Sequence, residues 1–132
     1  MFLQRNKDKP KLSKNQSTKA IGDLGENLAL CYLQSKGLKL VEKQYRCRFG
    51  ECDIIMRENN ILVFVEVRYK KNSRFCLPEE TIHYKKQQRL IKTAECFLFN
   101  YPTSDCRMDV VSIVGQEPNF KITWIPDAFG VQ

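Results

Sequence analysis

Two acidic residues lie in segments whose other residues are typical of buried strands. Asp53 lies in the run Gly50–Met56, and Glu66 follows the five apolar residues 61–65. A strand that apolar is usually covered on both faces, so an acid at its end lies near a buried layer and needs a partner. Two carboxylates held close together repel at pH 7 unless a cation lies between them or one of them is protonated. The pattern therefore favours a site for a hard divalent cation such as Mg²⁺.

The pairing of the two strands decides whether these acids meet. A two-residue turn at Asn59 and Asn60, where asparagine tolerates positive φ, places Asp53 directly opposite Glu66. Directly opposed Cβ atoms on one face lie about 4.5–5.5 Å apart. A turn one residue earlier pairs Asp53 with Phe64 instead, and a three-residue loop puts the two acids on opposite faces. Both alternatives stay open, as does an ordinary hairpin with solvated charges at its ends.

Composition and charge limit the class of protein. With 132 residues and a hydrophobic fraction of 42%, one globular domain is expected. No apolar run approaches the length that spans a membrane, and no signal-peptide core follows Met1, so a cytoplasmic location without membrane association is expected. Residues 1–20 carry +5 of the net charge of +7. We expect residues 1–16 to form a basic, disordered arm and residues 17–132 to form a single domain. Whether the protein forms a homodimer is left open.

The cysteines predict neither a zinc site nor a disulfide framework. None of the six belongs to a C-x-x-C pair, and His83 is the only histidine in the sequence. Most of the cysteines stand among apolar residues, so we expect small buried thiols.

The order of elements predicts a mixed sheet flanked by helices. The first helix begins with a cap at Ser17 or Thr18 and ends at Gly37, and the second runs from Pro78 to about Phe99. Strands are expected over residues 38–47, 50–56, 61–69, 108–114 and 120–125. This αβββαββ order indicates an α/β or α+β fold.

Other charged residues are candidates for the same site. Glu26 lies on the first helix beside its main apolar face, which carries Ile21, Leu24 and Cys31 at helical spacing. Small residues near Glu26 would let that helix approach the sheet closely. Two basic clusters follow the acidic pair in the sequence, as suits a phosphate-bearing substrate. They comprise Arg68, Lys70, Lys71 and Arg74, and then Lys85, Lys86, Arg89 and Lys92.

Five ordered motifs resemble the YraN-like family of small bacterial proteins. They are Gly22-x-x-Gly25-Glu26-x-x-Ala29-x-x-Tyr32-Leu33, residues 50–55 (GECDII), 63–68 (VFVEVR), 106–111 (CRMDVV) and 124–129 (WIPDAF). The resemblance covers nearly all of residues 20–130. That family is placed in the PD-(D/E)XK nuclease superfamily and is similar to archaeal Holliday-junction resolvases. The resemblance implies a restriction-endonuclease-like fold and a metal-dependent endonuclease acting on DNA, including branched or structured DNA.

The same resemblance implies roles for individual residues. Asp53, Glu66 and the carbonyl of Val67 would hold Mg²⁺ or Mn²⁺, and Glu26 would complete the catalytic set. Arg68 stands where the superfamily carries lysine, and because arginine effectively cannot lose its proton, a role in activating water is replaced by a phosphate clamp. The residues expected to contact nucleic acid are Arg68, Lys70, Arg74 and Lys86.

DNA is preferred over RNA as the partner because no aromatic platform typical of RNA readers appears in the sequence. Two other functions stay open. One is a nucleic-acid-binding module that is catalytically weak or inactive, and the other is a protein-interaction domain.

Overall fold

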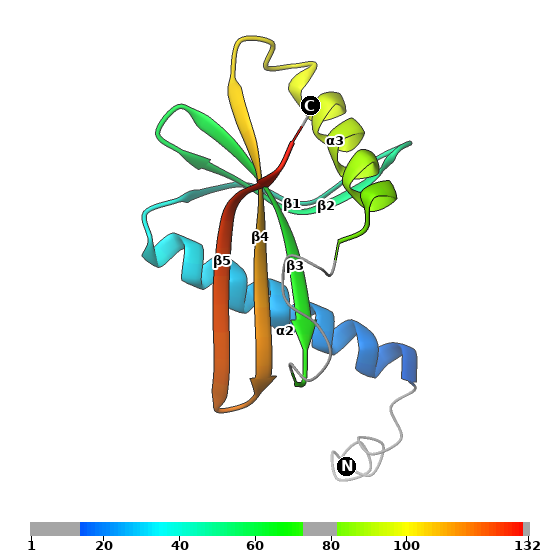
Figure 1. Ribbon diagram of the computed structural model, residues 1–132, viewed down its shortest axis with the longest axis vertical. Helices are drawn as coiled ribbons and strands as arrows, with labels where there is room; N and C mark the ends of the chain where they lie inside the picture. The colour runs from blue at the N-terminus through cyan, green and yellow to red at the C-terminus, as the bar shows by residue number, and fades with distance from the viewer. Residues whose placement is uncertain (1–13, 73–81, 131–132) are drawn as a thin grey trace, which may run out of the picture.

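The structure is a computed structural model that describes residues 14–72 and 82–130 (Figure 1). The elements in chain order are α2 (Lys14–Ser35), β1 (Lys39–Cys47), β2 (Gly50–Glu58), β3 (Ile61–Lys70), α3 (Tyr84–Leu98), β4 (Asp105–Gln116) and β5 (Asn119–Phe129). The αβββαββ order and the α+β class predicted from the sequence are confirmed, and the arrangement is consistent with a restriction-endonuclease-like fold.

A mixed five-stranded sheet forms the centre of the molecule, with its strands in sequence order from β1 to β5. Neighbouring strands pair antiparallel except β3 and β4, which run parallel with Ile61 opposite Asp105. Parallel neighbours need a long connection, and this one carries α3. As a result α3 packs on one face of the sheet while α2 covers the other (Figure 1).

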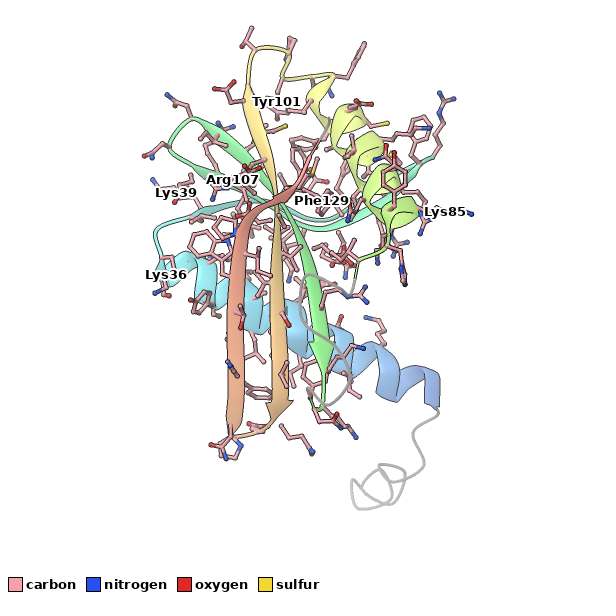
Figure 2. The ribbon with its side chains drawn as sticks, in the orientation of Figure 1. Lys36, Lys39, Lys85, Tyr101, Arg107 and Phe129 are labelled. Carbon is pink, nitrogen blue, oxygen red and sulfur yellow. The ribbon has the colours of Figure 1, made fainter. Side chains whose placement is uncertain are left out.

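The central strand β3 is buried on both faces, as its apolar run predicted. Val63 and Val65 point toward α2, while Leu62 and Phe64 point toward α3, so Glu66 continues the row that faces α3. Side chains fill the space on both sides of the sheet (Figure 2). The buried cluster under α2 contains Ala29, Leu33, Leu38, Ile54, Met56, Val63, Val65, Val111 and Ile113. The cluster under α3 contains Cys52, Ile55, Leu62, Phe64, Ile91, Ala94, Phe97 and Met108.

Helix α2 presents a different face to the sheet from the one predicted. Ile21 and Leu24 are each 38% exposed, whereas Gly25 and Ala29 are buried. A Cβ atom placed on Gly25 would lie 3.5 Å from the Cβ of Tyr69. Gly25 lets the helix approach the sheet closely, as expected, whereas Gly22 is exposed, and a Cβ atom placed on it would have no neighbour within 4 Å among the described residues. Ala29 and Leu33 pack in the core, while Ile21 and Leu24 lie toward the flank of the helix.

The C-terminal end of α2 was predicted correctly from the sequence, and its N-terminal start was not. Helix α2 ends at Ser35, and Gly37 terminates it as predicted, with a φ of +99° and its amide bonded to the carbonyl of Gln34. The predicted start of the helix is wrong by several residues. The helix already begins at Lys14, and the expected caps Ser17 and Thr18 lie inside it. Residues 14–16, assigned to the arm, are therefore helical, while residues 1–13 lie outside the described part.

Helix α3 begins at Tyr84, so a helix continuous from Pro78 is wrong. Pro78 lies outside the described residues, but Ile82 and His83 are not helical. Ile82 is buried, and its carbonyl accepts a hydrogen bond from the side chain of Gln87. Burial of Ile82 therefore fixes an extended entry into the helix, with His83 at the N-cap position.

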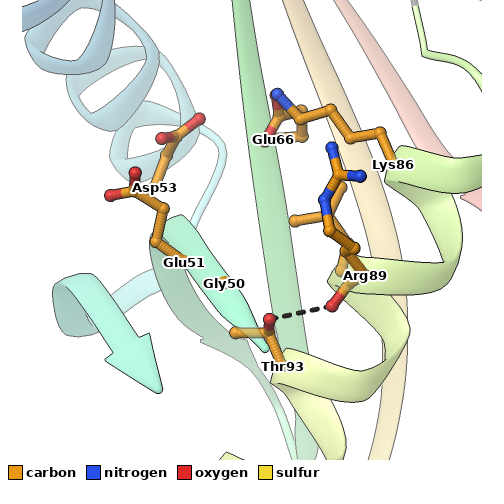
Figure 3. A pocket seen from close by; sticks show the side chains of 8 residues that line it. Gly50, Glu51, Asp53, Glu66, Lys86, Arg89 and Thr93 are labelled. Carbon is orange, nitrogen blue, oxygen red and sulfur yellow. Dashed lines mark hydrogen bonds and ion pairs between the residues drawn. The ribbon is translucent and has the colours of Figure 1, made fainter. Parts of the chain in front are cut away.

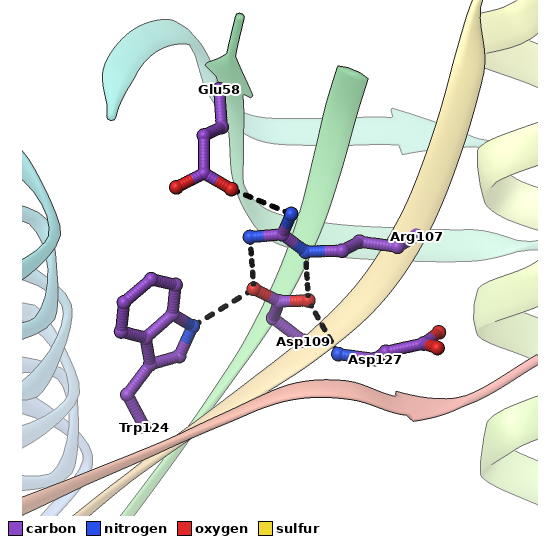
Figure 4. A network of polar contacts seen from close by, with 5 residues as sticks. All are labelled: Glu58, Arg107, Asp109, Trp124 and Asp127. Atoms are coloured by element: carbon purple, nitrogen blue, oxygen red, sulfur yellow. Dashed lines mark hydrogen bonds and ion pairs between the residues drawn. The ribbon is translucent and has the colours of Figure 1, made fainter. Parts of the chain in front are cut away.

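A buried carboxylate ties β4 to β5 (Figure 4). Asp109 has no exposed surface, and its oxygens accept hydrogen bonds from Arg107, from the indole of Trp124 and from the backbone amide of Asp127. Arg107 also pairs with Glu58 of β2 at 2.7 Å. This network holds three strands in register, so we assign these motif residues to the architecture of the sheet.

The prediction of mostly buried cysteines is wrong for the described residues. Of the five cysteines there, only Cys52 is buried, while Cys31 and Cys106 are exposed. Cys31 loses its expected burial because α2 packs through its small residues instead. Cys76 lies outside the described residues. No helix in residues 14–72 and 82–130 has the length and apolar character needed to cross a membrane. The cytoplasmic location stays a prediction.

Candidate active site

The β2–β3 hairpin closes in a two-residue turn that begins at Asn59, which has the expected positive φ of 54°. Backbone pairing runs from this turn to Ile54 opposite Val65. One step further along the two strands stand Asp53 and Glu66, whose side chains line the same pocket (Figure 3). The predicted register is therefore confirmed, and the two alternative turns are excluded.

Asp53 is fixed by the strand beside it. Its Oδ2 accepts a hydrogen bond of 2.9 Å from the backbone amide of Val67, the residue that follows Glu66. The Asp53 side chain therefore accepts the hydrogen bond of a strand amide that a backbone carbonyl would otherwise accept. This contact orients the Asp53 carboxylate toward the end of β3 where Glu66 and the Val67 backbone lie.

Burial, followed by the negative charge of Glu66, raises the pKa of Asp53 to about 7. The amide of Val67 and the charge of Lys86 oppose this rise, while Glu26 adds to it. A pKa near 7 would leave the Asp53 carboxyl present in both its protonated and its charged form at neutral pH. Sequence reasoning required either a cation or a proton for the paired acids. Burial and the charge of Glu66 favour the protonated form of Asp53, while Lys86 and Arg68 place positive charge beside Glu66.

The cation is supplied by side chains around Glu66, which is only 5% exposed. Lys86 of α3 places its Nζ 2.8 Å from Oε2 of Glu66, and a guanidinium nitrogen of Arg68 lies 3.7 Å from the same oxygen. An acid this deeply buried needs such partners. Lys86 was predicted to contact a nucleic-acid substrate, which stays a prediction, and the structure pairs it with Glu66.

The pocket has a volume of about 240 Å³ and lies between the sheet and α3. Figure 3 shows Asp53 and Glu51 on one side, with Lys86 and Arg89 reaching in from the helix on the other. Thr93 donates a hydrogen bond of 2.8 Å to the carbonyl of Arg89 one turn earlier. The lining residues are Gly50, Glu51, Asp53, Glu66, Lys86, Arg89, Leu90 and Thr93.

Glu26 lies beside this pocket and not in it. Its carboxylate accepts hydrogen bonds of 3.0 and 3.3 Å from the side chain of Gln44, and the two residues line an adjacent hollow. Gln44 lies between Lys43 and Tyr45 of β1, which pair with Ile54 and Cys52 of β2. Gln44 is therefore level with Asp53. Glu26 therefore acts on Asp53 through its charge, and we expect Gln44 to position it.

The comparisons with known proteins agree with the motifs. Residues 25–113 match the uncharacterised protein family UPF0102. The chain belongs to this family. It is the YraN-like family that the motifs indicated, and the matched span includes Glu26, Asp53, Glu66 and Lys86.

Three family relatives illustrate the extent of the likeness. The chain is 44% identical over 115 residues to a UPF0102 protein of Legionella pneumophila, covering 85% of this chain and 96% of the relative. It is 46% identical over 109 residues to one of Nitrosomonas europaea, covering 82% and 92%. For one of Caldicellulosiruptor bescii the identity is 41% over 116 residues, covering 84% and 98%. These names state no activity, so function has to be argued from the site.

The remaining predicted residues of the site fall into different places. Arg68 contacts Glu66 from two residues further along β3, while Lys70 is exposed at the end of that strand. Arg74 lies outside the described residues. Arg89 lines the pocket although only its cluster was singled out, and its signal was its spacing three residues after Lys86 on the helix.

Proposed function

We propose that this UPF0102 protein is a metal-dependent endonuclease that hydrolyses phosphodiester bonds in DNA. The observation that carries the proposal is that Asp53 and Glu66 line one pocket together with Lys86 and Arg89 of α3. Carboxylates suit a divalent cation, and the basic residues suit the phosphate that the cation would also contact. One or two Mg²⁺ or Mn²⁺ ions are the expected cofactors.

The donor set fits such a cation when a backbone oxygen is included. Among the described residues, no three His, Cys, Asp or Glu side chains converge as a metal-binding group. Asp53 and Glu66 would therefore be joined by the Val67 carbonyl, and water and phosphate would complete the shell, as Mg²⁺ prefers. When bound, the ion supplies an acidified water and neutralises charge on the phosphate.

Lys86 has the contacts and the chemistry to take over the role of the missing superfamily lysine. It lies 2.8 Å from Glu66, whereas Arg68 at the lysine position cannot lose its proton. With a cation bound at Glu66, the Lys86 ammonium would be free to donate a hydrogen bond to a phosphate oxygen. Its side chain is 37% exposed, which leaves room for that movement.

Arg68 and Arg89 are then expected to bind phosphate. Arg68 keeps a fixed charge beside Glu66, and a guanidinium can clamp a phosphate through two parallel hydrogen bonds. Arg89 reaches the pocket from the turn of α3 that follows Lys86 (Figure 3). Basic groups on two sides of the carboxylates would hold a phosphodiester across the pocket.

One observation favours a second candidate function. The contacts of Lys86 and Arg68 with Glu66 already neutralise the acid that a metal would need. If these contacts persist, the domain would bind nucleic acid without cleaving it. Such a binding module would ignore divalent metal and would weaken steeply with salt.

The deciding experiment incubates labelled flap, branched, single-stranded and duplex DNAs with the protein in Mg²⁺, in Mn²⁺ and in EDTA. We expect metal-dependent cleavage of at least one DNA, with Asp53→Asn and Glu66→Gln reduced to the EDTA level. Glu51→Gln is the matched control, because Glu51 lines the same pocket but is exposed and paired with Arg46. Binding that is indifferent to metal and never yields a product would support the second candidate and reject the first.

A further inference from the structure

An aromatic and basic surface lies next to the candidate active site. Phe49 stands in the turn between β1 and β2, with the guanidinium of Arg48 4.8 Å and the ammonium of Lys92 5.7 Å from its ring centre. No other aromatic ring among the described residues pairs with Phe49. Arg48 and Lys92 are both exposed, so the cations over the ring are side chains that can move.

Phe49 opens onto a hollow of about 600 Å³ between this turn and α3. Phe99 lines the same hollow and is 84% exposed, a high value for a phenylalanine. Tyr45 is held from behind by an edge-on contact with the buried ring of Phe97. The hollow is lined by Tyr45, Phe49, Lys92, Glu95, Cys96 and Phe99. Such a platform was not predicted from the sequence, because its rings come from β1, from a turn and from the end of α3. The preference for DNA over RNA therefore rests on the proposed function and not on the lack of an aromatic platform.

The hollow and the candidate active site share their supporting elements. Gly50, the residue after Phe49, lines the active-site pocket together with Thr93, the residue after Lys92. A Cβ at Gly50 would lie 3.3 Å from Oγ1 of Thr93, and its φ of +147° is one that other residues rarely adopt. The turn is thus pressed against α3, which fixes Phe49 relative to the pocket.

We infer that Phe49 is a stacking platform for an unpaired base of the DNA strand whose phosphate binds at the Asp53 and Glu66 pocket. This inference rests on the proposed function. The base would stack its flat apolar face on the ring, while the neighbouring phosphates of the strand would pair with Arg48 and Lys92. Arg48 can also stack its guanidinium plane on a base.

Charge complementarity favours nucleic acid over an apolar peptide as the occupant. Arg48 and Lys92 border the ring, Arg89 lies one turn before Lys92, and Glu95 is the single acid among the residues that line the hollow. An apolar peptide would gain little from these cations. Because a paired base is already stacked, the platform selects DNA with a single-stranded segment next to the bound phosphate.

The test measures binding in EDTA, so it does not depend on cleavage. Two fluorescent DNAs share one duplex, and only one of them carries a single-stranded tail. Unchanged protein should bind the tailed DNA more tightly. Phe49→Ala should weaken tailed binding about tenfold, within the range for loss of one base–aromatic stack, and should leave blunt binding unchanged. Phe49→Trp should retain the preference, and its fluorescence should be quenched by the tailed DNA alone.

Two controls separate stacking from loss of fold or of apolar surface. Phe49→Leu keeps an apolar side chain but should behave like Phe49→Ala. Tyr84→Ala removes an aromatic ring that is 72% exposed and does not line the hollow, and it should change nothing. Equal binding of both DNAs, equal tailed binding by Phe49→Ala and the parent, or no DNA binding at all would overturn the inference. A Phe49-dependent preference without cleavage in Mg²⁺ or Mn²⁺ would retain it and reject the endonuclease.

Discussion

The backbone amide of Val67 donates a hydrogen bond to the carboxylate of Asp53 across two neighbouring strands, at 2.9 Å. This bond joins the two halves of the site, because Val67 lies between Glu66 and Arg68 on β3. The residue whose carbonyl is proposed as a metal ligand therefore also orients the first acid. Changes at Asp53 should act on both the electrostatics and the geometry of the pocket.

The first prediction concerns the pH dependence of stability. The pKa of Asp53 is raised to about 7, so between about pH 4 and 7 the folded protein retains a proton that the unfolded chain releases. The contribution of this group is therefore greatest at low pH and is lost as pH rises through about 7. Asp53→Asn should remove this loss and stabilise the protein at pH 8 by about 2–4 kcal/mol.

Urea unfolding of the parent and of Asp53→Asn from pH 5 to pH 8.5, without divalent metal, measures this difference. Glu51→Gln is the control for losing an exposed carboxylate from the same strand. A constant difference between the parent and Asp53→Asn across this range would mean that Asp53 does not titrate there.

The second prediction concerns the competition between Lys86 and a metal for Glu66. Lys86→Met removes an ammonium 2.8 Å from the carboxylate, so calorimetric Mn²⁺ affinity should rise about tenfold. DNA cleavage should fall, because the variant lacks the proposed phosphate donor. Lys85→Ala is the matched control, since Lys85 is exposed and its side chain extends into solvent from α3 (Figure 2). Unchanged Mn²⁺ affinity in Lys86→Met would show that the metal binds elsewhere.

The third prediction assigns Arg68 to phosphate and not to proton transfer. Arg68→Ala should weaken DNA binding and reduce the slope of log affinity against log salt concentration by about one. Mn²⁺ affinity should stay the same or rise, because a cation 3.7 Å from Glu66 is removed. Arg68→Lys should restore much of the binding. Parent-like binding and cleavage by Arg68→Ala would make this residue purely structural.

The fourth prediction concerns the buried network around Asp109. Asp109→Ala leaves two guanidinium nitrogens of Arg107 and the indole of Trp124 without their acceptor, so it should destabilise the fold by about 3–5 kcal/mol. The loss should appear in urea unfolding, whereas any folded protein should retain parent-like Mn²⁺ affinity. Asp105→Ala, at an exposed position on the same strand, should have little effect. Selective loss of metal binding in a stable Asp109→Ala protein would instead place Asp109 in the site.

The sequence alone determined the features that depend on local chemistry and strand alternation. The turn at Asn59 and Asn60 gave one of the registers that the sequence left open, and the structure selected it. In that register the alternation of side chains along a strand brings Asp53 and Glu66 to one pocket. The apolar run before Glu66 correctly indicated a strand covered on both faces. Gly37 ended the first helix for the same local reason, since glycine accepts the positive φ of a helix C-terminus.

Tertiary packing decided the rest. The close approach of α2 turned Gly25 toward the sheet and left Cys31 exposed, although helical periodicity favoured the neighbouring face. The direction of α3 across the sheet brought Lys86 to Glu66. The spacing of residues within α3 or within β3 could not predict this contact between the two segments. Glu26 of α2 lies outside the pocket, where it is hydrogen-bonded to Gln44 of β1. Side-chain partners from distant segments depend on how helices pack on the sheet, which a pattern along one segment does not specify.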